Sequence, residues 1–195
     1  MKRSVPLAAA FLTVAATSAL AHTGTGPVSG FTAGFGHPIG GLDHVLAMVA
    51  VGILAAQLGG KSLWLVPASF VCMMVAGGLL GMTGLSVPFV ELGIVGSVVV
   101  LGVVIAAGRR LPLALAMALV GFLAVFHGHA HGIEMPANAS GLEYGTGFAV
   151  ATALLHAAGI ALGIGVEKAA QKLAPIAIRA SGGAIAALGT LLFIA

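Results

Sequence analysis

The chain of 195 residues is strongly apolar: 59% of its residues are hydrophobic, only 7% are charged, and the mean hydropathy is +1.15. Soluble domains carry roughly 25% charged residues, so a water-covered surface is excluded and a lipid solvent is indicated. The net charge of +3 is spread over single residues, which gives no basic stripe for nucleic acid. The single cysteine, Cys72, excludes an intrachain disulfide and a cysteine-based zinc site within one chain.

Residues 1–21 have the pattern of a secretory signal peptide. Met-Lys-Arg at 1–3 gives a positive start, residues 7–17 are apolar, and Ala19-Leu20-Ala21 is a small-residue cleavage pattern. The apolar run is shorter than the ~20 residues that a membrane span needs, which weighs against an uncleaved first helix. Cleavage leaves residues 22–195 as one domain that begins at His22.

Six apolar runs follow the signal peptide, at 38–58, 62–82, 89–107, 111–130, 145–166 and 174–195. Each is close to the ~20 residues that cross the hydrocarbon core as a helix. The runs are continuously apolar, whereas the strands of a membrane barrel alternate. We therefore predict an all-α fold, a polytopic bundle of six transmembrane helices. The spacings Gly77-x3-Gly81 and Gly159-x3-Gly163 favour close packing between those helices.

The basic residues predict the orientation of this bundle. If the mature N-terminus is exported, the connections near 59–62, 108–111 and 167–174 lie in the cytoplasm. The lysines and arginines of the mature chain all lie at these connections or at adjoining helix ends: Lys61, Arg109, Arg110, Lys168, Lys172 and Arg179. This agrees with the positive-inside rule and predicts that both mature termini lie outside the cytoplasm. Trp64 is then expected at the inner interface and Tyr144 at the outer one.

Ionisable residues gather in the outer half of the predicted bundle, where they are costly and usually functional. His37, Asp43 and His44 lie at the outer start of the first run. Pro38 is expected to begin that helix, which leaves His37 at a cap position. Glu91 lies in the outer first turn of the third run, where it either serves the same site or is favoured by the helix dipole alone.

The outer end of the fourth run carries the second group, Phe-His-Gly-His-Ala-His-Gly-Ile-Glu at 126–134. His127, His131 and Glu134, at i, i+4 and i+7, share one helix face, whereas His129 points the other way. Imidazole and carboxylate donors together suit Ni²⁺, Co²⁺, Zn²⁺ or Cu²⁺, while Mg²⁺ and Ca²⁺ require mostly oxygen donors. The two groups predict a metal site at the outer side.

Three further residues leave alternatives open. His156, in the middle of the fifth run, is either a second station on an inward path or a hydrogen-bonding residue between helices. Phe70, midway through the second run, is either a hydrophobic constriction below the cluster or ordinary core packing. His22 would offer an α-amine and an imidazole for metal capture. Ala-Ala-Gln-Leu-Gly-Gly-Lys-Ser at 55–62 fits a relaxed phosphate-loop pattern, but it follows a membrane helix instead of a strand, so no ATP site is expected.

The two histidine motifs resemble the signatures of the HupE/UreJ family, bacterial membrane proteins linked to nickel supply for hydrogenase and urease. The resemblance covers the signal peptide, the six spans and Glu91 after a proline. It implies secondary uptake of Ni²⁺, or of Co²⁺ in some members, across the bacterial inner membrane, with no ATP and no permanent cofactor. The mature termini outside the cytoplasm would then lie in the periplasm. It also implies metal roles for His37, Asp43, His44, His127, His129, His131 and Glu134.

The function that we expect is capture of a divalent ion at the outer cluster, followed by passage inward down the membrane potential. Because protonated histidines cannot bind metal, uptake should fall as the pH drops below about 6.5. Two other classes share these ligands: a metal-binding sensor or chaperone without translocation, and a membrane metalloenzyme. We do not expect an enzyme. Beyond the cluster only His156 and a few small or amide residues such as Gln57 lie deeper, so the sequence indicates only a sparse inward path.

Overall fold

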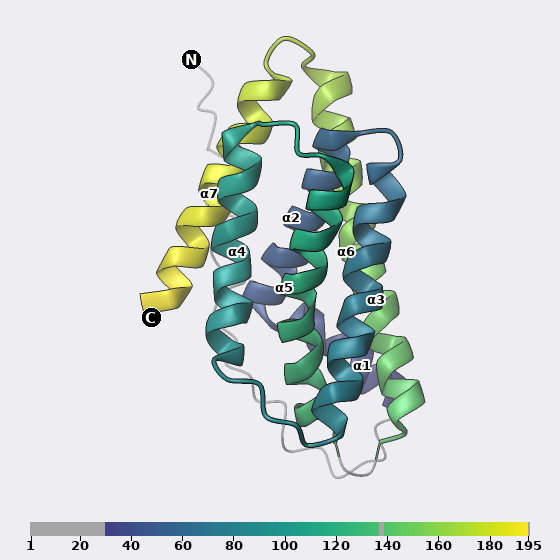
Figure 1. The fold of residues 1–195 in the computed structure, drawn as a ribbon. Helices are drawn as coiled ribbons and strands as arrows, with labels where there is room; N and C mark the ends of the chain where they lie inside the picture. Colours follow the sequence, from purple (N-terminus) through teal and green to yellow (C-terminus); the bar gives the residue numbers. More distant parts are fainter. Residues whose placement is uncertain (1–29, 137–138, 195) are drawn as a thin grey trace, which may run out of the picture.

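The computed structural model describes residues 30–136 and 139–194, which form seven α-helices and, within those ranges, no strand. The predicted signal peptide and His22 fall outside the described residues. The helices are α1 (Gly30–Gly40), α2 (Leu42–Leu58), α3 (Ser62–Met82), α4 (Val90–Ala107), α5 (Leu113–Glu134), α6 (Gly141–Ala169) and α7 (Ala174–Ile194). They pack into one elongated bundle (Figure 1).

The five helices from α3 to α7 are each long and apolar enough to cross a membrane. Helices α1 and α2 pass the same test only as a pair, and they are bent by 82° relative to each other. The described chain therefore has up to six spans, of which the first is broken. This confirms the all-helical membrane bundle that the hydropathy predicts.

The predicted start of the first span is wrong. Pro38 does not begin the spanning helix: it lies near the end of α1, and α2 begins only at Leu42. The chain turns at Gly41, which has an extended backbone with φ −101° and ψ 122°. A proline in the last turn of a short helix removes one backbone hydrogen bond, and the helix ends two residues later, as this loss favours. His37 is therefore a helical residue of α1.

Helix α1 forms because α6 continues beyond the membrane thickness. With 29 residues, α6 is about 44 Å long at 1.5 Å per residue, against about 30 Å for the hydrocarbon core. Its first turns, capped by the Ser140 hydroxyl, which accepts from the Glu143 amide, lie against α1. A side chain at Gly34 of α1 would overlap the backbone of Tyr144, so the two helices are in backbone contact.

Helix α2 is the centre of the bundle. It contacts each of the other six described helices, and its residues from Ala47 to Ala56 are buried except Val49. The small-residue spacings predicted from the sequence are at close crossings. A methyl group at Gly77 of α3 would overlap the Val125 carbonyl of α5, and one at Gly159 of α6 would overlap the Val49 carbonyl of α2.

The two ends of the bundle differ in chemistry. The connections between α2 and α3, α4 and α5, and α6 and α7 all lie at one end, at the top of Figure 1. We call this the basic end, because it carries the six lysines and arginines of the described chain. Trp64, in the first turn of α3, is 78% exposed there, as a residue at a membrane interface would be. The opposite end, with α1 and the end of α5, is called the histidine end.

Candidate metal centre

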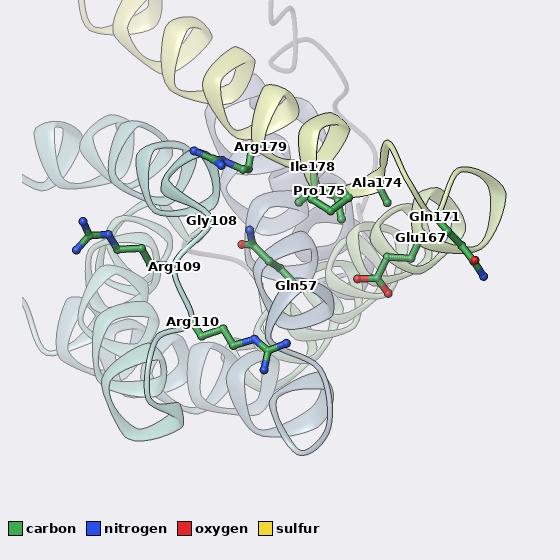
Figure 2. Close-up of a pocket in the computed structure, with 10 residues that line it drawn as sticks. All are labelled: Gln57, Gly108, Arg109, Arg110, Glu167, Gln171, Ala174, Pro175, Ile178 and Arg179. Carbon is green, nitrogen blue, oxygen red and sulfur yellow. The ribbon is translucent and has the colours of Figure 1, made fainter.

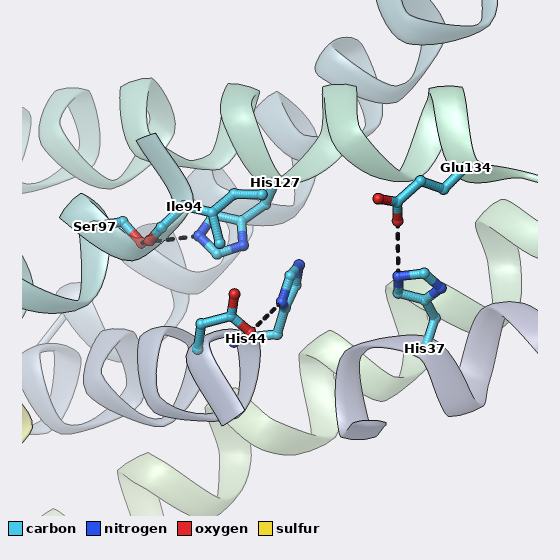
Figure 3. Close-up of polar contacts among 7 residues, drawn as sticks. His37, His44, Ile94, Ser97, His127 and Glu134 are labelled. Atoms are coloured by element: carbon cyan, nitrogen blue, oxygen red, sulfur yellow. Dashed lines mark hydrogen bonds and ion pairs between the residues drawn. The ribbon is translucent and has the colours of Figure 1, made fainter. Parts of the chain in front are cut away.

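At the histidine end, imidazoles from three helices face one another inside the bundle. His37 comes from α1, His44 from the first turn of α2, and His127 and His131 from α5. The 82° bend between α1 and α2 brings His37 and His44 to within 6.2 Å, measured between ring centroids. Figure 3 shows His44 between His127 on one side and His37 on the other. The four residues are called the imidazole cluster below.

The outer part of the cluster has a donor set for a metal ion. His37, His131 and Glu134 each offer one ligand atom, and these atoms lie within 4.8 Å of one another. In the structure, Nε2 of His37 is 3.1 Å from Oε2 of Glu134. The Glu134 side chain is 48% exposed, so the group opens towards the surrounding medium. Two imidazoles and a carboxylate suit a divalent transition metal.

Asp43 fixes the orientation of His44. Nδ1 of His44 lies 2.8 Å from Oδ1 of Asp43, which also accepts the His44 backbone amide at 2.8 Å. A carboxylate is an acceptor, so Nδ1 carries the proton and donates, and the lone pair is left on Nε2. Nε2 is buried and has no hydrogen-bond partner. The pair has the arrangement in which a carboxylate holds a histidine ready for a metal.

Ser97 of α4 does the same for His127. The Ser97 hydroxyl lies 2.6 Å from the Ile94 carbonyl and donates its proton there. Nε2 of His127, 2.9 Å from the same hydroxyl oxygen, must then be the donor in that contact. This leaves the lone pair on Nδ1, which is buried without a partner. The inner part of the cluster thus presents Nε2 of His44 and Nδ1 of His127, from rings 4.9 Å apart.

His131 belongs to both parts of the cluster. Its ring lies 4.4 Å from that of His37 and 4.7 Å from that of His44. The residue is 3% exposed, and neither of its ring nitrogens has a hydrogen-bond partner. Phe148 of α6 packs against its other side, with ring centroids 3.8 Å apart. One imidazole therefore connects an open outer donor set with a closed inner one.

Below the cluster, Phe70 of α3 lies between two buried imidazoles. Its ring is 5.7 Å from that of His127 and 5.1 Å from that of His156, measured between centroids. Phe70 is fully buried and His156 is 1% exposed. Both ring nitrogens of His156 lack a hydrogen-bond partner, so the hydrogen bond between helices considered for this residue is not present. Buried imidazoles therefore continue from the cluster, past the ring of Phe70, to His156 in the middle of α6. These buried imidazoles, of His44, His127, His131 and His156, are called the imidazole column below.

Two of the predicted site residues lie apart from the cluster. Nε2 of His129 donates to the Leu85 carbonyl at 2.6 Å, which ties α5 to the connection between α3 and α4. His129 thus faces away from His127 and His131, as the helical spacing predicts. Glu91 is exposed in the first turn of α4, and no contact between it and the cluster is recorded among the described residues. Metal roles for His129 and Glu91 stay predictions.

Sequence reasoning missed two residues that act on the cluster. Ser97 is a hydroxyl in the middle of an otherwise apolar span, and this position was a usable signal. Tyr144 was expected at the lipid interface, and this is wrong: the residue is 4% exposed, and its hydroxyl lies 3.2 Å from Nδ1 of His37. The reason is the broken first span, since α1 covers the part of α6 that would otherwise face lipid.

Comparison with known proteins gives a consistent result. A family model described as "HupE / UreJ protein" matches residues 10–192. The chain is 43% identical over 185 residues to the protein named "Protein HupE" of Rhizobium leguminosarum bv. viciae, and the match covers 94% of this chain and 95% of that relative. No solved structure matches the chain significantly.

Proposed function

This chain belongs to the HupE/UreJ family, a family of transporters and not of enzymes, and we propose that it carries Ni²⁺, or Co²⁺ in its place, inward across the bacterial inner membrane without ATP. Membership supports metal transport in general. The choice of metal, the direction and the route go beyond membership and are our proposal.

The observation that carries the proposal is a column of buried imidazole nitrogens without hydrogen-bond partners. The column contains Nε2 of His44, Nδ1 of His127, and both ring nitrogens of His131 and of His156. Leaving a buried polar group unpaired costs roughly 1–3 kcal/mol, so a chain selected for stability alone would not retain six such atoms in one column. Each of the four neutral rings has one nitrogen with a free lone pair, and a metal ion that binds these four lone pairs in turn explains why the unpaired imidazoles are kept.

The proposed route begins at His37, His131 and Glu134, where the ion exchanges part of its water shell for protein ligands. His131 then hands it to Nε2 of His44 and Nδ1 of His127. Phe70 separates this inner set from His156, and we propose that its ring is the hydrophobic constriction of the pathway. Transport also requires binding weak enough for release, and we propose that the imidazole and carboxylate ligands of this route, which include no thiolate among the described residues, meet that requirement.

The membrane potential is a sufficient energy source. A charge moving inward gains about 2.3 kcal/mol per 100 mV, so a divalent ion gains about 4.6 kcal/mol, which corresponds to accumulation of more than ~10³-fold. A chain of this kind needs no nucleotide-binding domain. The phosphate-loop pattern at 55–62 covers the end of α2, the turn at 59–61 and the first residue of α3, and neither helix is preceded by a strand there.

The test is uptake of ⁶³Ni²⁺ into sealed proteoliposomes with an imposed inside-negative potential. Wild type should accumulate the metal, and His131→Ala should abolish accumulation because both donor sets lose a ligand. The matched control is Glu143→Gln, which removes an exposed carboxylate of the same end that does not contact the cluster. Binding that depends on His131 without any accumulation would overturn transport and favour a sensor or chaperone.

A further inference from the structure

A polar cavity of about 400 Å³ lies at the basic end of the bundle. It is formed where the end of α2, the connection after α4, the end of α6 and the start of α7 meet (Figure 2). Its polar lining consists of Gln57, Arg109, Arg110, Glu167, Gln171 and Arg179. None of these residues belongs to the imidazole cluster, and none is Phe70 or His156.

The charges of this cavity favour an anion. The cavity lining contains three arginines and one glutamate, and the described residues contain no ion pair between Glu167 and any of the arginines. An excess of fixed positive charge repels a divalent cation, so this cavity does not serve the proposed metal route as a binding station. The planar fork of a guanidinium group matches phosphate oxygens, and several of them in one cavity make a phosphate group the best-fitting ligand.

Two side chains are held in place by the end of α4. Nε of Arg179 donates to the Ala106 carbonyl at 2.9 Å, and Nε2 of Gln57 donates to the Ile105 carbonyl at 3.2 Å. The terminal nitrogens of Arg179 remain for a ligand. Oε1 of Gln57, a lining residue, is buried without a partner, which leaves an acceptor beside the cavity that a donor from a ligand can satisfy.

We propose that this cavity binds a phosphodiester lipid headgroup that carries hydroxyl donors, of the phosphatidylglycerol type. The arginines bind the phosphate, and Oε1 of Gln57 and the Glu167 carboxylate accept from the headgroup hydroxyls. The position of the cavity favours a lipid over a soluble phosphate. The cavity and the exposed Trp64 lie at the same end of the bundle, and an exposed tryptophan there indicates the level of the membrane interface. Basic pockets between helices at the cytoplasmic side are suited to anionic headgroups.

The test uses the full-length protein purified in detergent and native mass spectrometry, with short-chain phosphatidylglycerol, short-chain phosphatidylcholine and inorganic phosphate as separate probes. Phosphatidylcholine carries a phosphate but no headgroup donor and no net charge. The test variant is Arg109→Gln/Arg110→Gln, in which both replaced residues are exposed, so folding is preserved. The control, Lys61→Gln/Lys172→Gln, removes two charges from the same end without touching the cavity lining.

We expect phosphatidylglycerol to bind at one site and at least tenfold more tightly than phosphatidylcholine. The arginine variant should weaken this binding roughly thirtyfold, whereas the lysine control should stay within about threefold of wild type. Saturable, arginine-dependent binding of inorganic phosphate that excludes the lipid would overturn the lipid and make the ligand a soluble phosphate. Equal lipid binding by the arginine variant and the lysine control would overturn the site itself.

Discussion

Two buried imidazoles of the cluster owe their orientation to single neighbours. Asp43 accepts the Nδ1 proton of His44, and Ser97 accepts the Nε2 proton of His127. In each case the other ring nitrogen keeps its lone pair and faces the interior without a partner. The tautomer of each imidazole is therefore set before any metal arrives, and the orienting residue affects affinity without being a ligand.

Asp43→Asn should weaken Ni²⁺ binding by about 10–100-fold, the usual effect of removing an orienting partner. The amide NH₂ group can donate to Nδ1 of His44, which would move the proton to Nε2 and block the metal-binding lone pair. Equilibrium dialysis with ⁶³Ni²⁺ on the purified protein measures this, with Glu143→Gln as the unaffected control. Loss as complete as in His44→Ala would instead identify Asp43 as a direct ligand, and unchanged affinity would refute the orienting role.

His156→Leu should separate stability from function. His156 is 1% exposed and both its ring nitrogens are unpartnered, so an apolar side chain of similar size should stabilise the fold by about 1 kcal/mol. If His156 is an inward station for the metal, the same variant should transport at least tenfold more slowly. Thermal unfolding and proteoliposome uptake are measured on one preparation. A more stable variant with unchanged uptake would remove His156 from the route.

At the scale of elements, hydropathy predicts five of the spans well, because a lipid-facing helix must be apolar over the bilayer thickness. It does not predict α1, since residues 30–37 are Gly-rich and form a helix only because α6 extends far enough to cover them. The break at Gly41 follows from that packing. Helical spacing along one segment is enough to place His127, His131 and Glu134 on one face. Contacts between helices depend on packing, so the sequence cannot show that Ser97 and Tyr144 reach this group from other helices.

The crossing of α2 and α6 depends on Gly159. A methyl group there would overlap the Val49 carbonyl, so Gly159→Ala should force the two helices apart and destabilise the protein by about 1–3 kcal/mol. Gly145→Ala is the matched control on the same helix, because nothing lies within 4 Å of its added methyl group; it should be neutral or stabilising by up to ~1 kcal/mol. Thermal unfolding in detergent compares the two, and equal effects would contradict the close crossing.

At the scale of the whole molecule, the bundle is chemically polarised along its axis. The imidazole cluster with Asp43 and Glu134 lies at one end, and all lysines and arginines of the described chain lie at the other. An inward transporter of cations needs its ligands at the side where the ion enters. The basic connections then lie in the cytoplasm, as the positive-inside rule favours. The proposed direction of transport therefore depends on the orientation of the bundle in the membrane.

Cysteine labelling tests that orientation directly. In a Cys72→Ser background, which removes the single native thiol, Ser86→Cys reports on the histidine end and Lys172→Cys on the basic end, both at exposed positions. A membrane-impermeant maleimide applied to intact spheroplasts should label Ser86→Cys at least tenfold more than Lys172→Cys, and lysis should make the two equal. The reverse preference would place the cluster in the cytoplasm. The ion would then meet the cluster only after it had crossed the membrane, so such a result would refute the proposal that His37, His131 and Glu134 capture the metal at the outer side before it moves inward.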